Sequence, residues 1–235
     1  MFFVSYFTHN NYEPYAKKLI ESLKKFNLAF EIEKKEDKFP NDPDKSWRYG
    51  TNLKPAFILQ KLIKFRCPIC WLDIDTEIIE YPEYLVGKII APGITRSVFR
   101  ESYDIAVYNW YDDDNKITNS NPEKLDCGEM LSSSGVFAFN YTSKAIELLI
   151  RWSSEVTKNP IIADDQLFDK VWNSVPELGA MLMSLPKEYN RMDRHWPHIK
   201  PVINHYWLDG AIRKENNNDK ENNNPYADII GSIKH

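Results

Sequence analysis

The sequence predicts an α/β protein, with one domain whose central sheet is mixed, mostly parallel and flanked by helices. Apolar strand-like segments alternate with helix-like segments in the order β-α-β-α-β over about the first 80 residues. A chain of 235 residues, 43% hydrophobic and 27% charged, can also bury one sizeable core. The net charge of −4 argues against a general nucleic-acid binder, so no nucleic acid is expected among its partners.

The first third of the chain is predicted to hold three strands and two helices. The strands are expected at residues 2–7, 28–32 and 69–72. The first helix carries apolar residues at spacings of four, four and three: Tyr15, Leu19, Leu23 and Phe26. A second helix is expected from about Asn52 to Phe65, with Pro55 in its first turn, where proline is tolerated. Residues 34–46, with Pro40 and Pro43, are predicted to form a loop.

The remaining elements are shorter and are separated by polar segments. Further strands are expected at residues 88–91, 104–108, 135–139, 181–185 and 202–206. Helices are expected from Ser143 to Val156 and from Asp164 or Asp165 onward. Residues 111–126 are rich in turn formers, and residues 213–235 form a polar, Asn-rich tail that cannot bury a core.

Glycine is scarce, at 8 of 235 residues, whereas aromatic residues make up 14%. The chain therefore lacks a Gly-rich loop for phosphate, and another device must hold any nucleotide. The N-terminus reads as a strand rather than a signal peptide, and no apolar stretch is long enough for a transmembrane helix. With three cysteines, of which Cys67 and Cys70 are interpreted as ordinary thiols, a cytoplasmic location is expected.

Two acids, Asp73 and Asp75, follow the apolar strand 69–72 directly. Ligands of open α/β sheets bind outside the carboxyl ends of the strands, and residues two apart on an extended chain point the same way. The two carboxylates would repel each other unless a cation or a proton lies between them. A Mg²⁺ or Mn²⁺ ion is a natural solution, since it leaves positions open for phosphate oxygens.

Other interpretations of this pair are open. A turn is one of them, because aspartate is common at strand ends. A calcium loop is excluded, because it would need Gly and Glu where Ile78 and Tyr84 stand. An aspartyl-phosphate phosphatase is disfavoured, because it would need Thr where Glu77 stands. Asp112 and Asp114 have the same spacing in a polar turn and are interpreted as surface residues.

The order of several segments resembles the GT-A (Rossmann-like) fold of nucleotide-sugar glycosyltransferases. These segments are FFVSYFT, TNLKPAFILQKL, WLDIDTEII, SSSGVFAFNYTSKAIELLIRW, ADDQLFDKVW, SLPKEYN and VINHYW. The resemblance covers about residues 1–208 and implies one domain over 1–212, with a donor half near 1–110 and an acceptor half near 111–212. It implies a hexosyltransferase-type enzyme using Mn²⁺ or Mg²⁺ and a nucleotide-diphosphate sugar such as a UDP-sugar. The acceptor, a glycan, protein or lipid head group, is not indicated, and retention of stereochemistry is implied.

The resemblance also implies residue roles. Asp73, Asp75 and His205 would hold the metal, although a histidine beside Tyr206 and Trp207 is also typical of a packed core. Residues that would contact the donor are Tyr6, Thr8, Lys54, Asp73, Ser134 and Gly135. The D-D-Q run, Asp164, Asp165 and Gln166, would face the reacting sugar carbon or the acceptor, and its acids also suit a helix N-terminus.

Two alternatives stay open from the sequence. The first is a non-catalytic module that binds nucleotide sugars or carbohydrate. The second is a phosphotransferase or nucleotidyltransferase that uses the same metal pair. The presence of both D-x-D acids and of the D-D-Q run favours the glycosyltransferase, in which a cation would replace the missing glycines as the phosphate anchor.

Overall fold

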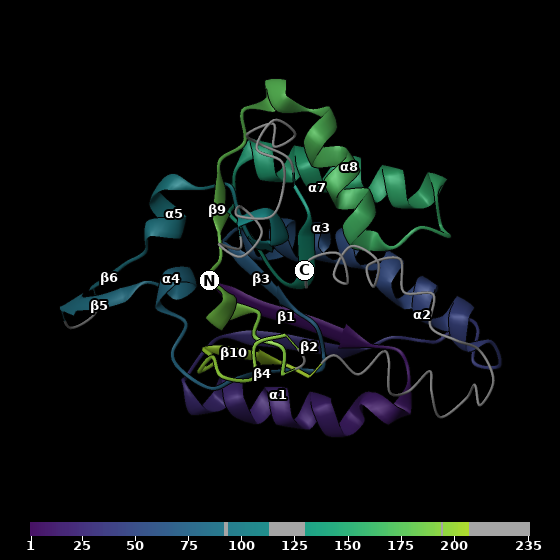
Figure 1. Ribbon diagram of the computed structural model, residues 1–235, viewed down its shortest axis with the longest axis horizontal. Helices are drawn as coiled ribbons and strands as arrows, with labels where there is room; N and C mark the ends of the chain where they lie inside the picture. Colours follow the sequence, from purple (N-terminus) through teal and green to yellow (C-terminus); the bar gives the residue numbers. More distant parts are fainter. Residues whose placement is uncertain (92–93, 113–129, 194, 207–235) are drawn as a thin grey trace.

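The structure is a computed structural model, and it describes residues 1–91, 94–112, 130–193 and 195–206 (Figure 1). Most of the predicted turn-rich segment 111–126 and the whole Asn-rich tail lie outside these residues. The surface interpretation of the Asp112–Asp114 pair also falls outside them, because Asp114 is not among the described residues.

A six-stranded sheet in the order β2-β1-β3-β8-β7-β9 forms the centre of the molecule. Its strands are β1 (Phe2–Phe7), β2 (Phe30–Lys34), β3 (Ile69–Leu72), β7 (Ile105–Asn109), β8 (Ser132–Phe139) and β9 (Leu182–Ser184). Neighbours pair in parallel except where β8 is involved, since β8 runs antiparallel to both β3 and β7. The predicted mixed, mostly parallel sheet flanked by helices is therefore confirmed.

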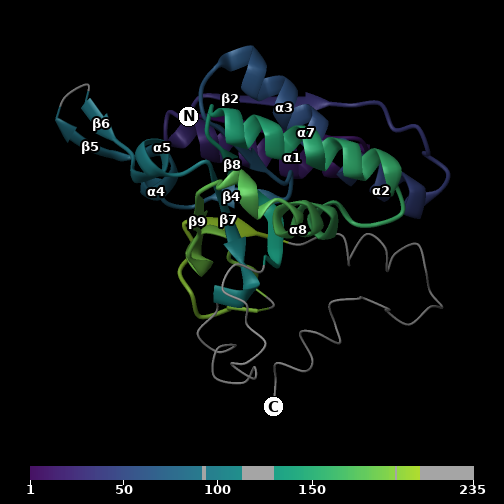
Figure 2. The same cartoon turned by 90° about the horizontal axis from the view of Figure 1, so that it is seen from above.

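Each face of this sheet is covered by its own hydrophobic core. On one face Val4, Trp71 and Phe137 pack under three long helices. These are α3 (Lys54–Phe65), α7 (Ser143–Lys158) and α8 (Asp164–Ser174), which lie together in Figure 2. The strand residues that precede Val4 and Trp71, namely Phe3 and Cys70, point to the opposite face of the sheet. Helix α1 (Glu13–Lys25) packs on that face. Burial on both faces explains why strand 69–72 is apolar throughout.

Two small sheets and several short helical segments complete the described fold. The small sheets pair β4 (Thr76–Ile78) with β10 (Ile203–His205) and β5 (Lys88–Ala91) with β6 (Ile94–Arg96). The β5–β6 hairpin projects from the body of the molecule in both views (Figures 1 and 2). The short helices are α4 (Glu83–Val86) and α5 (Val98–Ser102), and the 3₁₀ turns are η1 (Asn10–Tyr12), η2 (Trp110–Asp112), η4 (Pro176–Leu178) and η5 (Lys187–Tyr189).

The predicted loop at residues 34–46 is wrong at its end, because helix α2 (Pro43–Asn52) begins inside it. Asp42 caps this helix by accepting a hydrogen bond from the Lys45 N–H at 3.1 Å. Pro43 occupies the first turn, where its missing N–H costs no helical hydrogen bond. Here the proline marks the start of a helix rather than an interruption.

Two predicted strands differ in place or partner. The strand expected at 28–32 lies at Phe30–Lys34, because the N–H of Leu28 still bonds back to Leu23 and residue Asn27 turns the chain with a φ of 52°. The strand at 88–91 exists, but within the described part of the chain it pairs with β6 and not with the central sheet. Strands β4 and β6 and helices α4 and α5 were not predicted, since each has five residues or fewer.

Candidate metal and nucleotide site

Asp73 and Asp75 lie just beyond the carboxyl end of β3, which is the position that the sequence predicted for them. Asp73 still continues the β3–β8 ladder, since its N–H bonds to the carbonyl of Gly135 at 2.8 Å. The chain then turns, because Thr76 returns both its N–H and its hydroxyl to the Asp73 carbonyl, at 3.0 and 2.7 Å. The two acids therefore converge through a turn, and the extended-chain geometry used to predict their convergence is wrong.

His205 reaches these acids through the pairing of two very short strands. Antiparallel pairing of β10 with β4 sets His205 directly opposite Thr76, the residue after Asp75. Its Nε2 lies 3.4 Å from Asp75 Oδ1 and 3.9 Å from Asp73 Oδ2. One ligand atom from each of the three residues lies within 4.8 Å of the others, and both His205 and Asp75 are buried. The structure thus brings together the three residues predicted to hold a metal.

Gly135 makes room for the imidazole. A Cβ at this position would lie 2.6 Å from both Cε1 and Nδ1 of His205, closer than real Cβ contacts occur. The predicted reason for glycine at 135 was close approach of a donor sugar. The contact seen within the protein is with His205, so the lack of a side chain at residue 135 makes room for the imidazole beside Asp73 and Asp75.

Lys54, in the first turn of α3, is the counter-ion of the site. Its ammonium is 3.1 Å from Asp73 Oδ1 and 2.9 Å from Asp164 Oδ2, and it donates to the hydroxyl of Ser134 at 3.0 Å. The residue is only 2% exposed. Lys54 therefore ties together the ends of β3 and β8 and the first turn of α8, bringing three of the predicted donor or catalytic residues into one cluster.

Trp71 completes the environment of Asp73 and was missed from the sequence. Its indole N–H donates to Asp73 Oδ1 at 2.7 Å, the same oxygen that faces Lys54. The second oxygen, Oδ2, is the one directed to His205. Because Oδ1 already contacts Lys54 and Trp71, Oδ2 is the oxygen that could bind a cation. Trp71 and Asp73 are two apart on one strand, so the alternation of side chains was the signal that could have found this contact.

Electrostatics of the cluster favour a bound cation. Burial lowers the pKa of Lys54, but attraction to Asp164 and Asp73 outweighs it and holds the pKa above its ordinary value. The lysine stays charged, yet it faces the carboxylates of both acids, and Asp75 adds another nearby. Two carboxylates and an imidazole form a donor set suited to Mn²⁺ or Mg²⁺, with carboxylate oxygen the preferred ligand. The residues present therefore fit the predicted ion.

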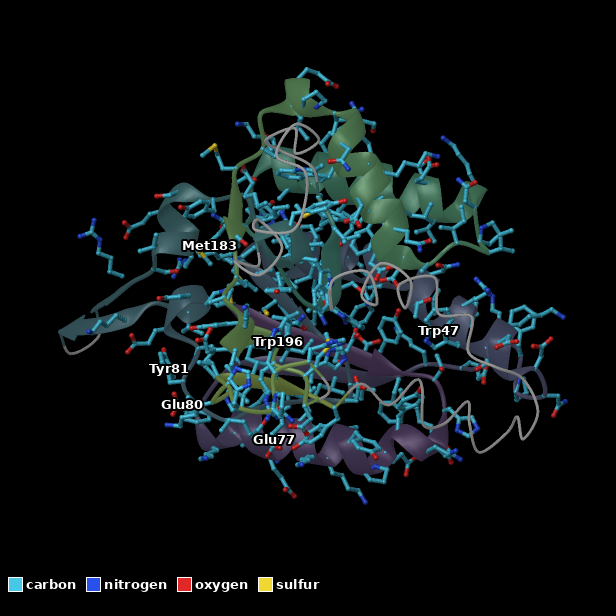
Figure 3. The ribbon with its side chains drawn as sticks, in the orientation of Figure 1. Trp47, Glu77, Glu80, Tyr81, Met183 and Trp196 are labelled. Atoms are coloured by element: carbon cyan, nitrogen blue, oxygen red, sulfur yellow. The ribbon has the colours of Figure 1, made fainter. Side chains whose placement is uncertain are left out.

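A pocket of about 360 Å³ opens beside these residues. It lies between the end of β1 and helix α2, and Asp73, Asp75 and Lys54 line one end. The remaining wall is aromatic and polar, with Thr8, Asp37, Ser46 and Trp47 among its residues (Trp47 is labelled in Figure 3). Its size is within the range of small-molecule sites. Helix α2 supplies much of this wall, so the unpredicted helix is part of the site.

Tyr6 and Thr8 both line the pocket, as expected for donor-binding residues, but Tyr6 is largely a core residue. Its hydroxyl donates to the carbonyl of Gly50 in α2 at 2.5 Å, and its ring packs on Trp71. Burial, together with Asp164 and Asp73, raises the pKa of Tyr6 well above its ordinary value. Tyr6 is thus a neutral hydrogen-bond donor that fixes α2 to the sheet.

The D-D-Q run occupies the first turn of α8. Asp164 is buried and contacts Lys54, whereas Asp165 and Gln166 are half-buried. Among the described residues neither Asp165 nor Gln166 lines the pocket. The roles predicted for them at the reacting sugar carbon therefore stay predictions, while Asp164 has a visible partner within the protein.

No protein-family model matches the sequence, and no curated protein matches it. Solved structures do. A glycosyltransferase involved in the glycosylation of the major capsid of PBCV-1 superposes with a TM-score of 0.57 at 16% identity, covering 90% of this chain and 98% of that one. Mouse xyloside xylosyltransferase 1 gives a TM-score of 0.47 at 13% identity, covering 86% of this chain and 96% of its own. The galactosyltransferase LgtC gives 0.48 at 13% identity, covering 99% of this chain and 100% of its own.

The first of these similarities extends over nearly all of both chains, so it concerns the whole domain rather than one motif. The described helices include none with the length and apolar character needed to cross a bilayer. At this level of identity the likeness establishes architecture. The chain is therefore a single α/β domain with the GT-A fold of glycosyltransferases.

Proposed function

We propose that the protein is a metal-dependent glycosyltransferase that moves a sugar from a nucleotide-diphosphate sugar to an acceptor hydroxyl. The observation that carries the proposal is the convergence of Asp73, Asp75 and His205, of which the two acids also line the pocket between β1 and α2. A UDP-sugar is the donor to test first, and Mn²⁺ or Mg²⁺ is the proposed ion.

In this proposal each group of residues has a separate role in binding the donor. When bound, the cation supplies positive charge against the diphosphate that leaves with the nucleoside. Lys54 and Trp71 hold one oxygen of Asp73 so that the other faces the ion. Thr8 and the residues of α2 that line the pocket would enclose the nucleoside. Ser134 and the first turn of α8, which Lys54 joins, would lie near the sugar.

The sugar end of the reaction is assigned to Asp165 and Gln166. Glycosyl transfer develops positive charge on the sugar, which a carboxylate or an amide oxygen stabilises. Both residues extend from the helix turn that Lys54 fixes through Asp164. Retention of stereochemistry at the sugar carbon is part of the proposal, and the anomer of the product would test it.

The donor assay is incubation with Mn²⁺ and a panel of nucleotide sugars, with release of nucleoside diphosphate as the signal. Slow hydrolysis of one donor without an acceptor is expected. Tight binding with no turnover under any acceptor would favour a binding module instead. Release of pyrophosphate or inorganic phosphate would favour a phosphotransferase or nucleotidyltransferase.

Asp75→Ala tests the metal assignment. The variant loses a buried carboxylate 3.4 Å from His205, so we expect Mn²⁺-dependent donor binding to fall at least about tenfold. Donor affinity is measured by calorimetry with Mn²⁺ and again with EDTA. Asp44→Ala is the matched control, since Asp44 is an exposed acid in α2. An unchanged Mn²⁺-dependent affinity in Asp75→Ala would refute the assignment.

A further inference from the structure

Asn190 carries a buried amide beside the metal-binding residues. The residue follows η5 and is 0% exposed, and neither its Oδ1 nor its Nδ2 has a hydrogen-bond partner among the residues that the structure describes. Leaving both ends of an amide unpaired in the protein interior costs free energy, on the order of 1–3 kcal/mol per group. Such a group calls for an explanation, and its surroundings supply one.

The backbone places Asn190 next to His205. The next residue, Arg191, donates its N–H to Ile203 at 3.2 Å and accepts from the N–H of His205 at 2.8 Å. On the sheet side, the Asn190 Oδ1 lies 3.2 Å from the point where a Cβ of residue 135 would stand. The Nδ1 of His205 lies 2.6 Å from that same point. The amide and the imidazole therefore share the space over Gly135.

The chemistry of a metal-binding histidine gives this amide a use. His205 directs Nε2 towards Asp75 and Asp73, so Nε2 is the nitrogen that faces the ion. A neutral imidazole that binds a cation through Nε2 carries its hydrogen on Nδ1. Ligating histidines almost always donate that hydrogen to an oxygen acceptor, which fixes the tautomer and the ring orientation.

We propose that Asn190 is a positioning residue for His205, and that its side-chain oxygen accepts the Nδ1–H of the imidazole when Nε2 binds a divalent cation. The inference rests on the proposed function, because it requires that a cation binds. A rotation of the Asn190 side chain in the space over Gly135 would bring the two atoms together, and no hydrogen bond to the described residues opposes it.

The test is a titration of the metal-free protein with MnCl₂ alone, followed by electron paramagnetic resonance of free Mn²⁺. Asn190→Leu keeps the size of the side chain and removes the acceptor, so we expect the Kd for Mn²⁺ to rise about 10–100-fold. The Tm of the metal-free variant should equal or exceed that of the wild type, because a buried unpaired amide has been removed. A merely structural asparagine would give the opposite pattern, a lower Tm and an unchanged Kd.

Two further variants serve as controls for the role of the Asn190 oxygen. Asn190→Asp retains an oxygen acceptor and should keep at least the wild-type affinity for Mn²⁺. Asn109→Leu is the control, because buried Asn109 accepts from the N–H groups of Tyr111 and Leu131 at 3.2 and 3.1 Å. Loss of those bonds should lower the Tm and leave the Kd for Mn²⁺ unchanged.

A double-mutant cycle decides whether Asn190 acts through His205. In the His205→Ala background, Asn190→Leu should cause no further loss of Mn²⁺ affinity. An equal loss in both backgrounds, or wild-type affinity in Asn190→Leu, overturns the inference. If the wild type itself fails to bind Mn²⁺, or if Asp75→Ala binds it normally, the proposed function fails as well, so the two failures are distinguishable.

Discussion

Gly135 illustrates how one absent carbon atom makes room for the side chain of His205. The His205 ring lies over its Cα, and strand β8 supplies the rigid backbone on which it rests. The Asp73 N–H bonds to the carbonyl of the same residue. Gly135 therefore fixes two of the three residues that converge at the site, one through its backbone and one through its lack of a side chain.

Gly135→Ala should displace His205, since the new Cβ would lie 2.6 Å from two atoms of the ring. We expect Mn²⁺ affinity to fall about 10–100-fold, as when the support of a ligand is lost. The measurement is the same Mn²⁺ titration. Gly50→Ala is the matched control, because its nearest new contact would be an ordinary 3.6 Å to Thr8. A Gly135→Ala protein that binds Mn²⁺ normally would contradict the contact.

Lys54→Met should destabilise the protein by about 3–5 kcal/mol, because it leaves Asp73 and buried Asp164 without their cation. It should also weaken Mn²⁺ binding, since Asp73 is no longer held. Urea unfolding and the Mn²⁺ titration measure the two effects. Lys61→Met is the control, because Lys61 is equally buried but pairs with Glu31 and Glu33 of β2, which lies two strands away from β3 in the sheet. It should lower stability alone.

At the level of residues, the end of an apolar strand was sufficient to predict that Asp73 and Asp75 belong to one site, whereas Lys54 was predicted from the family resemblance alone. The partners of Lys54 were not predictable. Its contact with Asp164 joins residues 110 positions apart, through helix packing that no local pattern encodes. Trp71 appeared to be a core residue because its polar atom is a small part of a large apolar ring.

Helix α8 brings a second buried acid towards the sheet. The Asp169 Oδ1 accepts the N–H of Ser132 at 2.9 Å, which fastens the helix to the start of β8. Burial raises the pKa of Asp169 to about 7, and the nearby acids Asp165 and Asp164 add to the rise. Below that pH the folded protein keeps this side chain protonated.

The contribution of Asp169 to the free energy of unfolding falls as the pH rises, because its pKa is higher in the folded than in the unfolded protein. Between the ordinary value of 3.8 and about 7 the unfolded chain ionises Asp169 while the folded one does not. Asp169→Asn stays neutral and keeps the oxygen acceptor, so its stability relative to the wild type should increase across this window, by at most about 4 kcal/mol. Urea unfolding at about pH 4.5 and about pH 8 measures it. A constant difference between the two proteins would refute the pKa assignment.

Helices with long apolar stripes were predictable as elements, whereas α2 was not. Helices α1, α3 and α7 carry buried residues at helical spacing, which a periodic pattern detects. Helix α2 instead has polar residues along most of its length and covers a pocket rather than the core. Its start signals, Asp42 followed by Pro43, looked identical to those of a turn.

On the scale of the whole molecule, a bound ion should stabilise the fold by mass action. An ion that binds only the folded chain adds RT ln(1 + [L]/Kd), about 2.7 kcal/mol at 100 times the Kd. We therefore expect the Tm to rise with MnCl₂ and to fall back with EDTA. The same scan on Asp75→Ala should show no rise, and an equal rise in both proteins would indicate binding elsewhere.

The architecture could be predicted because alternating strands and helices leave few ways to form one sheet. The direction of β8 could not be predicted, since the local sequence pattern does not tell whether a strand runs parallel or antiparallel to its neighbours. The pairing of β4 with β10 was equally hidden, because two three-residue strands have no usable period. His205 was thus predictable from resemblance alone, and its contact with the acids required the structure.

The β4–β10 pairing also affects the order in which parts of the site can form during synthesis of the chain. Asp73 and Asp75 leave the ribosome about 130 residues before His205, so a nascent chain can form the first strands, α1 and α3 while the third ligand has not yet been made. Contacts between residues so far apart in sequence form late in folding as a rule, so we expect the group of Asp73, Asp75 and His205 to assemble after the first strands. Under the proposed function, a cation would then bind tightly only to chains in which β10 has paired with β4.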